Sequence, residues 1–279
     1  MTFYDCFFGI GGARIGFERA GHKCVGGCEK GKWQRIIYER HFGEEKTQGD
    51  ITKVEGNELP DFDFLTAGLP CQPFSTANTT GERGFIREDA KLLFDVLRLV
   101  EYKRPAFFVF ENVSGLLSDS EGRSFATWLV QISKMGYDAE WAYLYGASFG
   151  LKCGHEHIFL IGWDNKRISP EKILPEWDTT PVYSFAVQKA AWQTIPRITS
   201  KTSRLGFDNN AIVLDRRGFR QLTPGEIEQI VGLPKGWTSG IPETARLKSL
   251  GNLWPPVMAE FIGNYCLPKG GVDGDSKRG

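Results

Sequence analysis

The stretch that decides how this chain is interpreted is Gly68-Leu69-Pro70-Cys71-Gln72-Pro73-Phe74-Ser75, which follows an apolar run over residues 62–67. An apolar run that ends in Gly and Pro predicts a buried strand whose carboxyl end passes into a loop. Cys71 then lies where α/β proteins place their chemistry. The flanking prolines restrain it, and a thiolate nucleophile needs such restraint together with an electropositive neighbourhood. At this point a small buried cysteine is an equally good interpretation.

Three other blocks surround this octet along the chain. They are Phe7-Phe8-Gly9-Ile10-Gly11-Gly12, Glu111-Asn112-Val113 and Gly251-Asn252. Taken in order with the Pro-Cys-Gln stretch, they resemble the motifs of the cytosine-C5 DNA methyltransferases, over residues 3–163 and 212–265. Any one block is weak evidence, whereas four in register are strong. The resemblance implies an α/β fold, a Rossmann-like S-adenosylmethionine-dependent methyltransferase sheet with helices on both faces and a small inserted second domain.

The composition fits one large α/β domain with a small attachment, because 41% of the 279 residues are hydrophobic. The formal net charge is zero, so DNA would have to bind through a local concentration of Lys and Arg, such as residues 197–220. The six cysteines form no Cys-x-x-Cys pair, and the start has no signal core. No apolar run approaches the roughly 20 residues that span a membrane. We therefore expect a cytoplasmic protein with reduced thiols and no membrane segment.

A glycine-rich turn follows a strand-like run over 3–8 and precedes an amphipathic segment over 13–20. Strand, glycine turn and helix in succession allow a cofactor to approach the backbone, although a plain tight turn has the same pattern. The spacing differs from Gly-x-Gly-x-x-Gly and argues against NAD. The resemblance implies that the turn holds the methionine part of S-adenosylmethionine. Its expected contacts are Phe7, Gly9, Gly11 and Gly12.

Acidic residues follow the next predicted segments. Glu29 ends a strand over 23–28, where a carboxylate can accept both ribose hydroxyls of a nucleoside, although most glutamates are simply exposed. Asp50 matches the family position that binds the adenine amino group, and an N-cap or turn aspartate is an open alternative. Lys30 stands where the family often has tryptophan. The resemblance implies three further cofactor contacts, which are Ile51, Leu92 and Asn252.

The run over 106–110 predicts another buried strand, which ends at Glu111. A carboxylate directly after such a strand should have a raised pKa unless it is paired, and a general acid near neutral pH requires a raised pKa. Glu111 and Cys71 would then lie at neighbouring strand ends. The resemblance implies that the cysteine adds to C6 of cytosine, the glutamate binds N3, and C5 takes the methyl group. The residues expected around the target base are Pro70, Gln72, Ser75, Asn112 and Val113.

Cys153, His155 and His157 alternate where the family has Gln-x-Arg-x-Arg. The alternation would place all three on one face of a strand. In one interpretation the two histidines are catalytic residues that donate to the phosphate or the base, as far as their protonation allows. In another, the site is weakened or adapted to another substrate, and these two interpretations remain open. A metal site is disfavoured because no fourth ligand is identifiable, so we expect no metal.

Between residues 163 and 195 the periodic pattern lapses, and the resemblance implies that the domain that reads DNA sequence begins here. A target-recognition domain this small has room for few base contacts, which predicts a short or weakly specific recognition site. Thr223-Pro224-Gly225-Glu226 predicts a helix start with a capping box. The expected domains are a catalytic and cofactor-binding domain over 1–163 plus 243–268, a target-recognition domain over 164–242, and a disordered tail over 269–279. Helices are expected over 33–41, 89–102, 124–135 and 257–265.

Together these features predict a monomeric DNA cytosine-C5 methyltransferase that acts on a cytosine flipped out of duplex DNA, with S-adenosylmethionine as its cofactor. A cognate restriction nuclease is the partner we would look for. An enzyme of the same chemistry that acts on RNA, single-stranded DNA or a free nucleotide is one alternative, because the reader is short and the net charge is zero. A nucleic-acid-binding homologue without turnover is another, because the two arginines are replaced.

Overall fold

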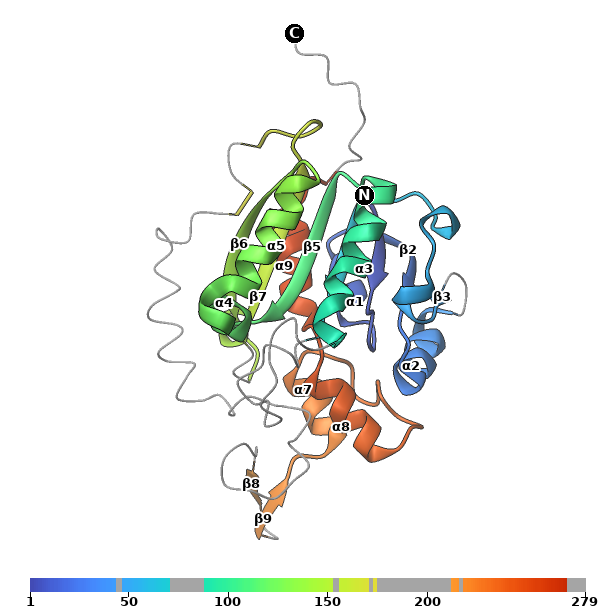
Figure 1. Ribbon diagram of the computed structural model, residues 1–279. Coiled ribbons are helices and arrows are strands. Elements are labelled where there is room, and N and C mark those ends of the chain that lie inside the picture. Colours follow the sequence, from blue (N-terminus) through green and yellow to red (C-terminus); the bar gives the residue numbers. More distant parts are fainter. Residues whose placement is uncertain are drawn as a thin grey trace.

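A seven-stranded sheet of order β3-β2-β1-β4-β5-β7-β6 organises the molecule (Figure 1). The computed structural model describes residues 1–43, 47–70, 88–152, 156–170, 173–174, 212–215 and 218–269, and for 88–90, 212–215 and 218–221 it describes the backbone. The first five strands are parallel, and β7 is antiparallel to both of its neighbours. The strands are β1 (Thr2–Cys6), β2 (Lys23–Cys28), β3 (Thr47–Gln48), β4 (Phe64–Gly68), β5 (Phe107–Val113), β6 (Tyr137–Tyr145) and β7 (Glu156–Asp164).

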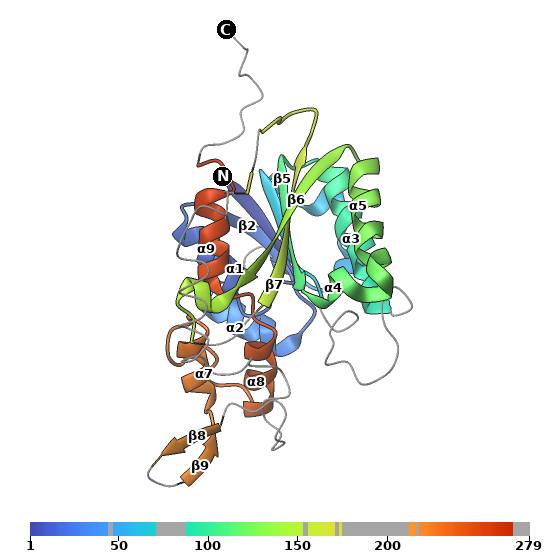
Figure 2. The ribbon, with the colours of Figure 1, turned by 90° about the vertical axis from the view of Figure 1, so that its left-hand side faces the viewer.

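Helices cover both faces of this sheet, as Figure 2 shows. On one face lie α1 (Gly12–Arg19), α2 (Lys32–Phe42) and α9 (Pro256–Tyr265). On the other lie α3 (Glu88–Lys103), α4 (Gly115–Ser118) and α5 (Arg123–Lys134). Every residue of β5 is buried, because helices pack on both of its sides. Short 3-10 helices complete the connections, which are η1 (Ile51–Lys53), η2 (Gly56–Glu58), η4 (Asp119–Gly122) and η5 (Gly146–Phe149).

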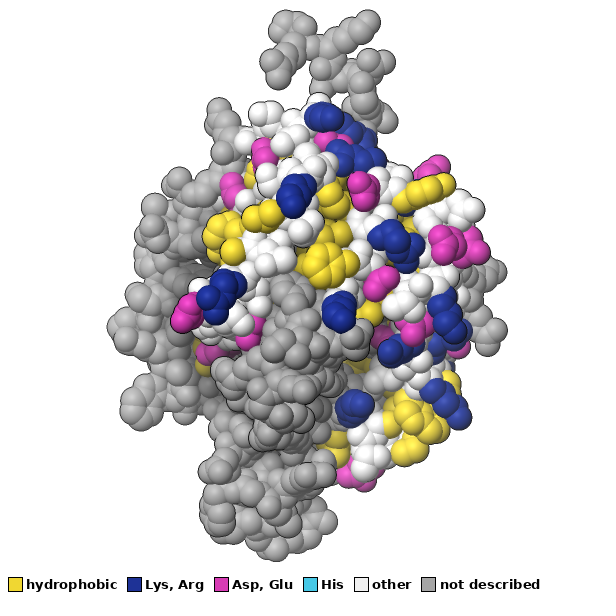
Figure 3. All heavy atoms as spheres, viewed as in Figure 1, with side chains coloured by type: hydrophobic (Ala, Val, Ile, Leu, Met, Phe, Trp, Pro, Cys, Tyr) yellow, Lys and Arg dark blue, Asp and Glu magenta, His cyan; other side chains and the backbone are white. Residues whose placement is uncertain are grey.

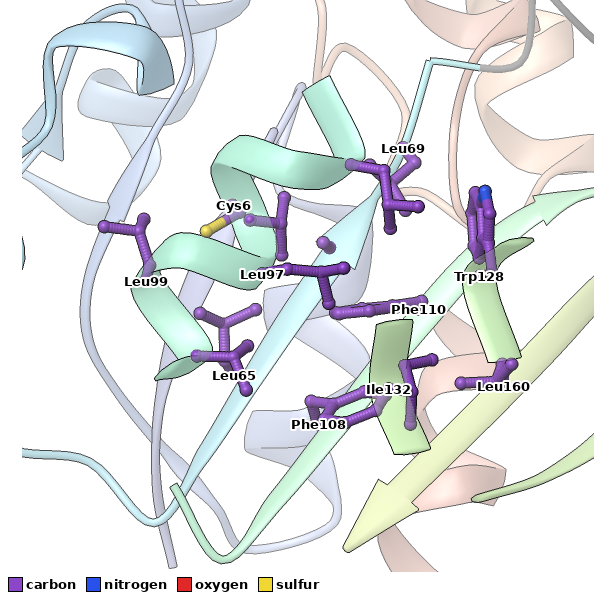
Figure 4. Close-up of a cluster of buried hydrophobic side chains, with 14 of the residues drawn as sticks. Cys6, Leu65, Leu69, Leu97, Leu99, Phe108, Phe110, Trp128, Ile132 and Leu160 are labelled. Atoms are coloured by element: carbon purple, nitrogen blue, oxygen red, sulfur yellow. The ribbon is translucent and has the colours of Figure 1, made fainter. Parts of the chain in front are cut away.

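Two apolar clusters fix the layers. The cluster under α3 and α5 includes Leu97, Phe110 and Trp128 (Figure 4). The cluster under α1 and α9 includes Phe17 and Met258. The last helix therefore packs beside the first, in the same layer on one face of the sheet.

The region before α9 holds a third apolar cluster, built from α7 (Pro224–Ile230) and α8 (Glu243–Gly251) against Ile10 and Ile37. The Trp237 indole N–H donates to the Ile10 carbonyl at 2.9 Å, and His41 stacks on the same indole. This region is therefore joined to the glycine turn and to α2. The strands β8 (Ile212–Asp215) and β9 (Gly218–Gln221) form a separate two-stranded sheet. The predicted division into domains stays a prediction.

The predicted elements agree with the observed ones in type, and their ends differ by a few residues. The capping box is confirmed, because Thr223 and Glu226 exchange hydrogen bonds at the start of α7. Strand β6 pairs with β7 along nine residues. Helix α8 was not predicted, because its apolar positions are sparse. The described cysteines, Cys6, Cys24, Cys28 and Cys266, are free thiols, as expected.

Candidate active site

A cavity of about 350 Å³ opens at the carboxyl ends of the central strands. Its wall combines the glycine turn after β1, the ends of β2, β4 and β5, the start of β7, and the connection from α8 to α9. Of the residues that the sequence analysis selected, it contains Phe7, Gly9, Gly12, Glu29, Asp50, Ile51, Pro70, Leu92, Glu111, Val113, His157 and Asn252. Segments far apart in the sequence thus meet at one edge of the sheet.

The glycine turn is tied tightly to the end of β2. The N–H groups of Phe7 and Phe8 both donate to the carbonyl of Cys28, at 2.7 and 3.3 Å. Gly9 and Gly11 have φ values of 55° and 88°, which glycine adopts without strain. A Cβ at Gly12 would collide with the carbonyl oxygen of Trp254. The turn therefore needs glycine both for its conformation and for its close packing against the start of α9.

Gly11 has a different role from its neighbours, because it does not line the cavity. A Cβ at this position would collide with the Phe42 ring of α2 and would lie 3.3 Å from the Tyr38 ring. Gly11 thus allows α2 to approach the turn. Its predicted contact with the cofactor stays a prediction.

Glu29 is half-buried and holds the turn in place. One carboxylate oxygen accepts from the Gly9 N–H at 3.2 Å, and the other accepts from the Gly31 N–H at 2.7 Å. Burial raises the pKa of Glu29, and the hydrogen bonds from Gly31 and Gly9 oppose that rise. Each carboxylate oxygen has a second lone pair, so hydroxyl groups of a ligand can still bind there.

Asp50 is an N-cap and also lines the cavity. Its Oδ1 accepts from the N–H and the hydroxyl of Thr52, at 3.1 and 3.0 Å, and these bonds lower its pKa. Its Oδ2 lies 3.8 Å from the ammonium group of Lys30. The capping alternative is therefore observed, and it leaves room for the predicted adenine contact at Oδ2.

Glu111 and His157 form a buried pair in the wall of the cavity. They face the same side of the sheet, since Val113 and His157 are paired residues of the antiparallel strands β5 and β7. The His157 Nδ1 is hydrogen-bonded to the Glu111 Oε1, and both side chains are less than a tenth exposed. The sequence predicted a raised pKa for Glu111 only if the carboxyl were unpaired, and it is paired.

The start of the cysteine octet lies against this pair. Gly68 is the register partner of Glu111, and a Cβ there would lie 3.4 Å from the Glu111 Oε2. The Leu69 N–H donates to the Glu111 carbonyl at 3.1 Å. Pro70 lines the cavity, and Cys71 follows it directly in the chain. Five further predicted residues lie outside the described part of the chain. They are the site residues Cys71, Gln72, Ser75 and His155, and the alternative metal ligand Cys153.

Asn112 lies on the opposite side of β5 from Glu111. It is fully buried, its Oδ1 accepts from the Val113 N–H at 2.8 Å, and it does not line the cavity. Its predicted contact with substrate stays a prediction. Across the described part of the chain, no group of three His, Cys, Asp or Glu side chains could hold a metal ion.

Asp5 and Trp254 are among the cavity-lining residues that were not selected from the sequence. Asp5 is 1% exposed, and burial raises its pKa to about 8 although Arg14 lies nearby. Trp254 is 6% exposed and packs against Phe17 and Phe159. Among the described residues, neither the Asp5 Oδ2 nor the Trp254 Nε1 has a hydrogen-bond partner. An acid inside the apolar run over 3–8 was the signal that could have identified Asp5.

The strand order and the cavity at the strand ends define a methyltransferase of the S-adenosylmethionine-dependent fold. Solved structures agree. The chain is similar to the Entamoeba histolytica methyltransferase EhMeth, with a TM-score of 0.74 at 15% identity over 95% of this chain and 97% of that one. The Schizosaccharomyces pombe protein, Dnmt2 methyltransferase, gives 0.68 at 16% identity over 94% and 97%. At these identities the likeness concerns the fold, and the predicted fold is confirmed.

Sequence comparison gives the family. The family model described as C-5 cytosine-specific DNA methylase matches residues 1–178. The type II methyltransferase M.HaeII of Haemophilus aegyptius is 38% identical over 93% of this chain and 91% of its own length. The Neisseria gonorrhoeae relative M.NgoBI is 32% identical over 94% and 92%. The Bacillus subtilis relative M.BsuFI is 42% identical over 58% of this chain, a match that spans 39% of that protein.

The chain therefore belongs to the C-5 cytosine-specific DNA methylase family, and its enzyme class is DNA (cytosine-5-)-methyltransferase. The predicted family and enzyme class are confirmed. This family uses S-adenosylmethionine as methyl donor and DNA as substrate. None of the described helices is both long and apolar enough to span a bilayer.

Proposed function

We propose that this chain transfers the methyl group of S-adenosylmethionine to C5 of a cytosine flipped out of duplex DNA, through a covalent bond between Cys71 and C6. The observation that supports the proposal most directly is the position of Glu111. This acid lies in the cavity beside Gly68 and Leu69, three residues and two residues before Cys71. Glu111 ends one strand, and Cys71 follows the neighbouring strand in the sequence. A general acid and a nucleophile supplied in this way can act on opposite edges of one pyrimidine.

The residues have separate tasks in this proposal. Cytosine C5 is a poor nucleophile, so the Cys71 thiolate first forms a bond to C6 and pushes electrons towards N3 and C5. Glu111 donates a proton to N3, which limits the charge that develops on the ring. S-Adenosylmethionine, when bound, supplies an electrophilic methyl group. Loss of the C5 proton to solvent, cleavage of the S–C6 bond and return of the N3 proton to Glu111 then restore the thiolate, the C5=C6 double bond and the acid.

His157 acts in the proposal as a donor to Glu111. When Glu111 has given its proton to N3, the His157 Nδ1–H stabilises the carboxylate through the hydrogen bond that the pair forms. Histidine changes its charge near neutral pH, whereas arginine does not. We assign His155 a related contact with the phosphate or the base, together with Pro70, Gln72, Ser75, Asn112 and Val113.

The cavity residues fit S-adenosylmethionine. The carboxylate of Glu29 lies where ribose hydroxyls can bind, and the backbone at Gly12 allows no larger residue. Asp50 keeps one oxygen free of the cap for the adenine amino group. We assign the cofactor to this wall, with Phe7, Gly9, Ile51, Leu92 and Asn252 as the other contacts.

We further propose a cytoplasmic, monomeric enzyme of low or short sequence specificity that acts beside a cognate restriction nuclease. The relatives named above are type II methyltransferases, which supports this role. On the face in Figure 3, Lys and Arg side chains are interspersed with Asp and Glu. A DNA contact would therefore use few basic residues of this face, in line with a zero net charge.

Methyl transfer from labelled S-adenosylmethionine to four substrates tests the proposal. The substrates are unmethylated duplex DNA, single-stranded DNA, tRNA and dCMP. We expect transfer to duplex DNA that is lost in Cys71→Ala, and sequencing of the methylated bases gives the recognition site. Transfer to tRNA or dCMP but not to duplex DNA would contradict the substrate assignment. Activity retained in Cys71→Ala would contradict the mechanism.

A further inference from the structure

The glycine turn has a strained backbone that needs support from its surroundings. Phe7 has a φ value of 57°, in the left-handed region that residues other than glycine rarely adopt. Such a conformation persists only where neighbouring groups determine it. Part of the support comes from β2, because the Cys28 carbonyl accepts from the N–H groups of Phe7 and Phe8. The Glu29 carboxylate accepts from Gly9. These bonds hold the first half of the turn.

The end of the turn is held by Trp237, which lies between α7 and α8. These two helices lie next to α2, beyond the carboxyl ends of the strands (Figure 1, Figure 2). The Trp237 indole N–H donates to the Ile10 carbonyl at 2.9 Å, although the two residues are 227 positions apart. Ile10 is 2% exposed and lines the cavity, whereas Trp237 does not line it. Trp237 can therefore act on a ligand of the cavity only through the turn.

The loop that carries Trp237 is anchored on both sides of this residue. The buried Glu228 carboxylate accepts from the N–H of Gly236 at 2.5 Å and from the N–H of Thr238 at 2.9 Å. These two residues flank Trp237 in the sequence. The loop is thus fixed by its own region, and its indole N–H points to the turn from a defined position.

The rings of α2 orient the indole further. His41 stacks on it with ring centroids 3.6 Å apart and 6° between the planes, and Phe42 meets it edge-on at 5.8 Å. Phe42 is also the ring against which Gly11 packs. The Trp237 side chain therefore makes two separable kinds of contact. The ring packs on α2, and the N–H bonds to the turn.

We propose that Trp237 is a positioning residue for cofactor binding, because its N–H holds the Ile10 carbonyl and with it the conformation of the glycine turn. The inference rests on the S-adenosylmethionine site proposed above, since the turn belongs to its wall. Without this bond the turn samples other conformations, and a ligand must restore the binding-competent one at the expense of its affinity. Trp237 takes no part in the methyl transfer itself, so the rate at saturating cofactor does not depend on it.

Trp237→Phe removes the N–H and keeps a ring against His41 and Phe42. We expect the Kd of S-adenosylhomocysteine and the KM for S-adenosylmethionine to rise by about two- to tenfold, the range of one hydrogen bond. The kcat at saturating cofactor and the KM for duplex DNA should change by less than about twofold. A merely structural role would lower the amount of active enzyme, and so kcat, without raising the KM for the cofactor. Calorimetry and steady-state methylation measure these constants.

Trp33→Phe is the matched control. Trp33 of α2 packs on the same apolar cluster as Trp237 and does not line the cavity. The same substitution there should leave the Kd of S-adenosylhomocysteine and the KM for S-adenosylmethionine unchanged.

Hydrogen exchange of the free protein tests the turn without a ligand. The N–H groups of Phe7, Phe8 and Gly11 donate within the turn and to its neighbours. We expect a peptide that covers residues 7–12 to exchange faster in Trp237→Phe than in the native protein, and the buried strand β5 to exchange at the same rate in both.

The inference is wrong if Trp237→Phe binds S-adenosylhomocysteine as tightly as the native protein, or if Trp33→Phe weakens binding by the same factor. Unchanged exchange over residues 7–12 would also refute it, because weaker binding would then have another origin. If the native protein binds no S-adenosylhomocysteine, the proposed cofactor site fails and the inference fails with it. If the native protein and Trp237→Phe bind equally, the cofactor site stands and only the role of Trp237 is refuted.

Discussion

Asp5 of the cavity and Glu228 of the C-terminal region are both buried carboxyl groups, but their pKa values are shifted in opposite directions. Glu228 is 0% exposed, yet it accepts hydrogen bonds from Thr238, Gly236 and Arg246. Burial would raise its pKa, but the bonds from Thr238, Gly236 and Arg246 outweigh it and lower the pKa. Within the part of the chain that the structure describes, the Asp5 Oδ2 has no hydrogen-bond partner, and burial raises the pKa of Asp5 to about 8. A buried acid thus keeps a low pKa where several donors surround it, and its pKa rises where they do not.

The largest effect should come from Glu111, the cavity acid with a catalytic assignment. Glu111→Gln keeps the shape of the side chain but removes the proton donor to N3. We expect methyl transfer to fall by about 10²- to 10⁴-fold, the range for a general acid, with little change in thermal stability. Steady-state methylation and a thermal melt measure the two quantities. A variant that melts far below the native protein would instead indicate a structural role.

Glu228→Ala should produce the largest loss of stability. The variant removes the acceptor of the buried Thr238 hydroxyl and of the Arg246 Nη2, so we expect a loss of about 3–5 kcal/mol in the free energy of unfolding. Urea denaturation measures it. The conservative Glu228→Gln keeps part of the network and should lose less. An unchanged midpoint for the alanine variant would mean that this network does not hold the loop after α7.

Asp5→Asn should change stability in the opposite direction, and only at higher pH. The folded pKa of about 8 lies above the unfolded value of 3.8, so the folded state binds more protons, and the native protein loses stability as pH rises between those values. The asparagine variant lacks this decline. We expect it to be more stable than the native protein by at least about 1 kcal/mol at about pH 8, and closer to it at about pH 4. Parallel pH-dependences for the two proteins would contradict this account.

Glu228 gives the matching control for pH. Its folded pKa is lowered, so its contribution is present above its unfolded pKa and is lost as pH falls through the folded value. Acidification should therefore weaken the native protein more than Glu228→Gln. The two buried acids predict losses of stability at opposite ends of the pH range.

The smallest effect should come from the cap of α7. Thr223→Ala removes the hydroxyl that accepts from the Glu226 N–H at 3.3 Å. We expect a loss of about 0.5–2 kcal/mol in urea denaturation and unchanged methyl transfer. A large loss of activity would show that this helix start has a role beyond its own stability.

The sequence was informative where chemistry and local pattern coincide. The cavity lining by Phe7, Glu29 and Glu111 follows from strands that end in glycine or acid, since parallel strands bring such ends together. Helices α3 and α5 have clear apolar stripes and were predicted for that reason. Helix α8 has few apolar positions, so only its packing against α7 specifies it.

Long-range pairing explains what sequence reasoning missed in the site. The bond between Glu111 and His157 depends on the antiparallel register of β5 with β7, which no local pattern encodes. Asp5 was overlooked because it lies inside an apolar run. The lack of a hydrogen-bond partner for its Oδ2 among the described residues can be seen only in the folded structure. The packing of the Trp254 ring against Phe17, and the lack of a partner for its indole N–H among the described residues, could be seen only in three dimensions.

The central claim is that Cys71 and Glu111 act together on one cytosine beside the cofactor. Incubation with S-adenosylmethionine and duplex DNA that contains 5-fluorocytosine tests it most directly, because fluorine at C5 cannot leave as a proton does. We predict a covalent protein–DNA complex that survives denaturing electrophoresis, maps by mass spectrometry to Cys71, is absent in Cys71→Ala and forms much more slowly in Glu111→Gln. A native protein that methylates cytosine normally but forms no such complex, or forms it at another residue, would contradict the account.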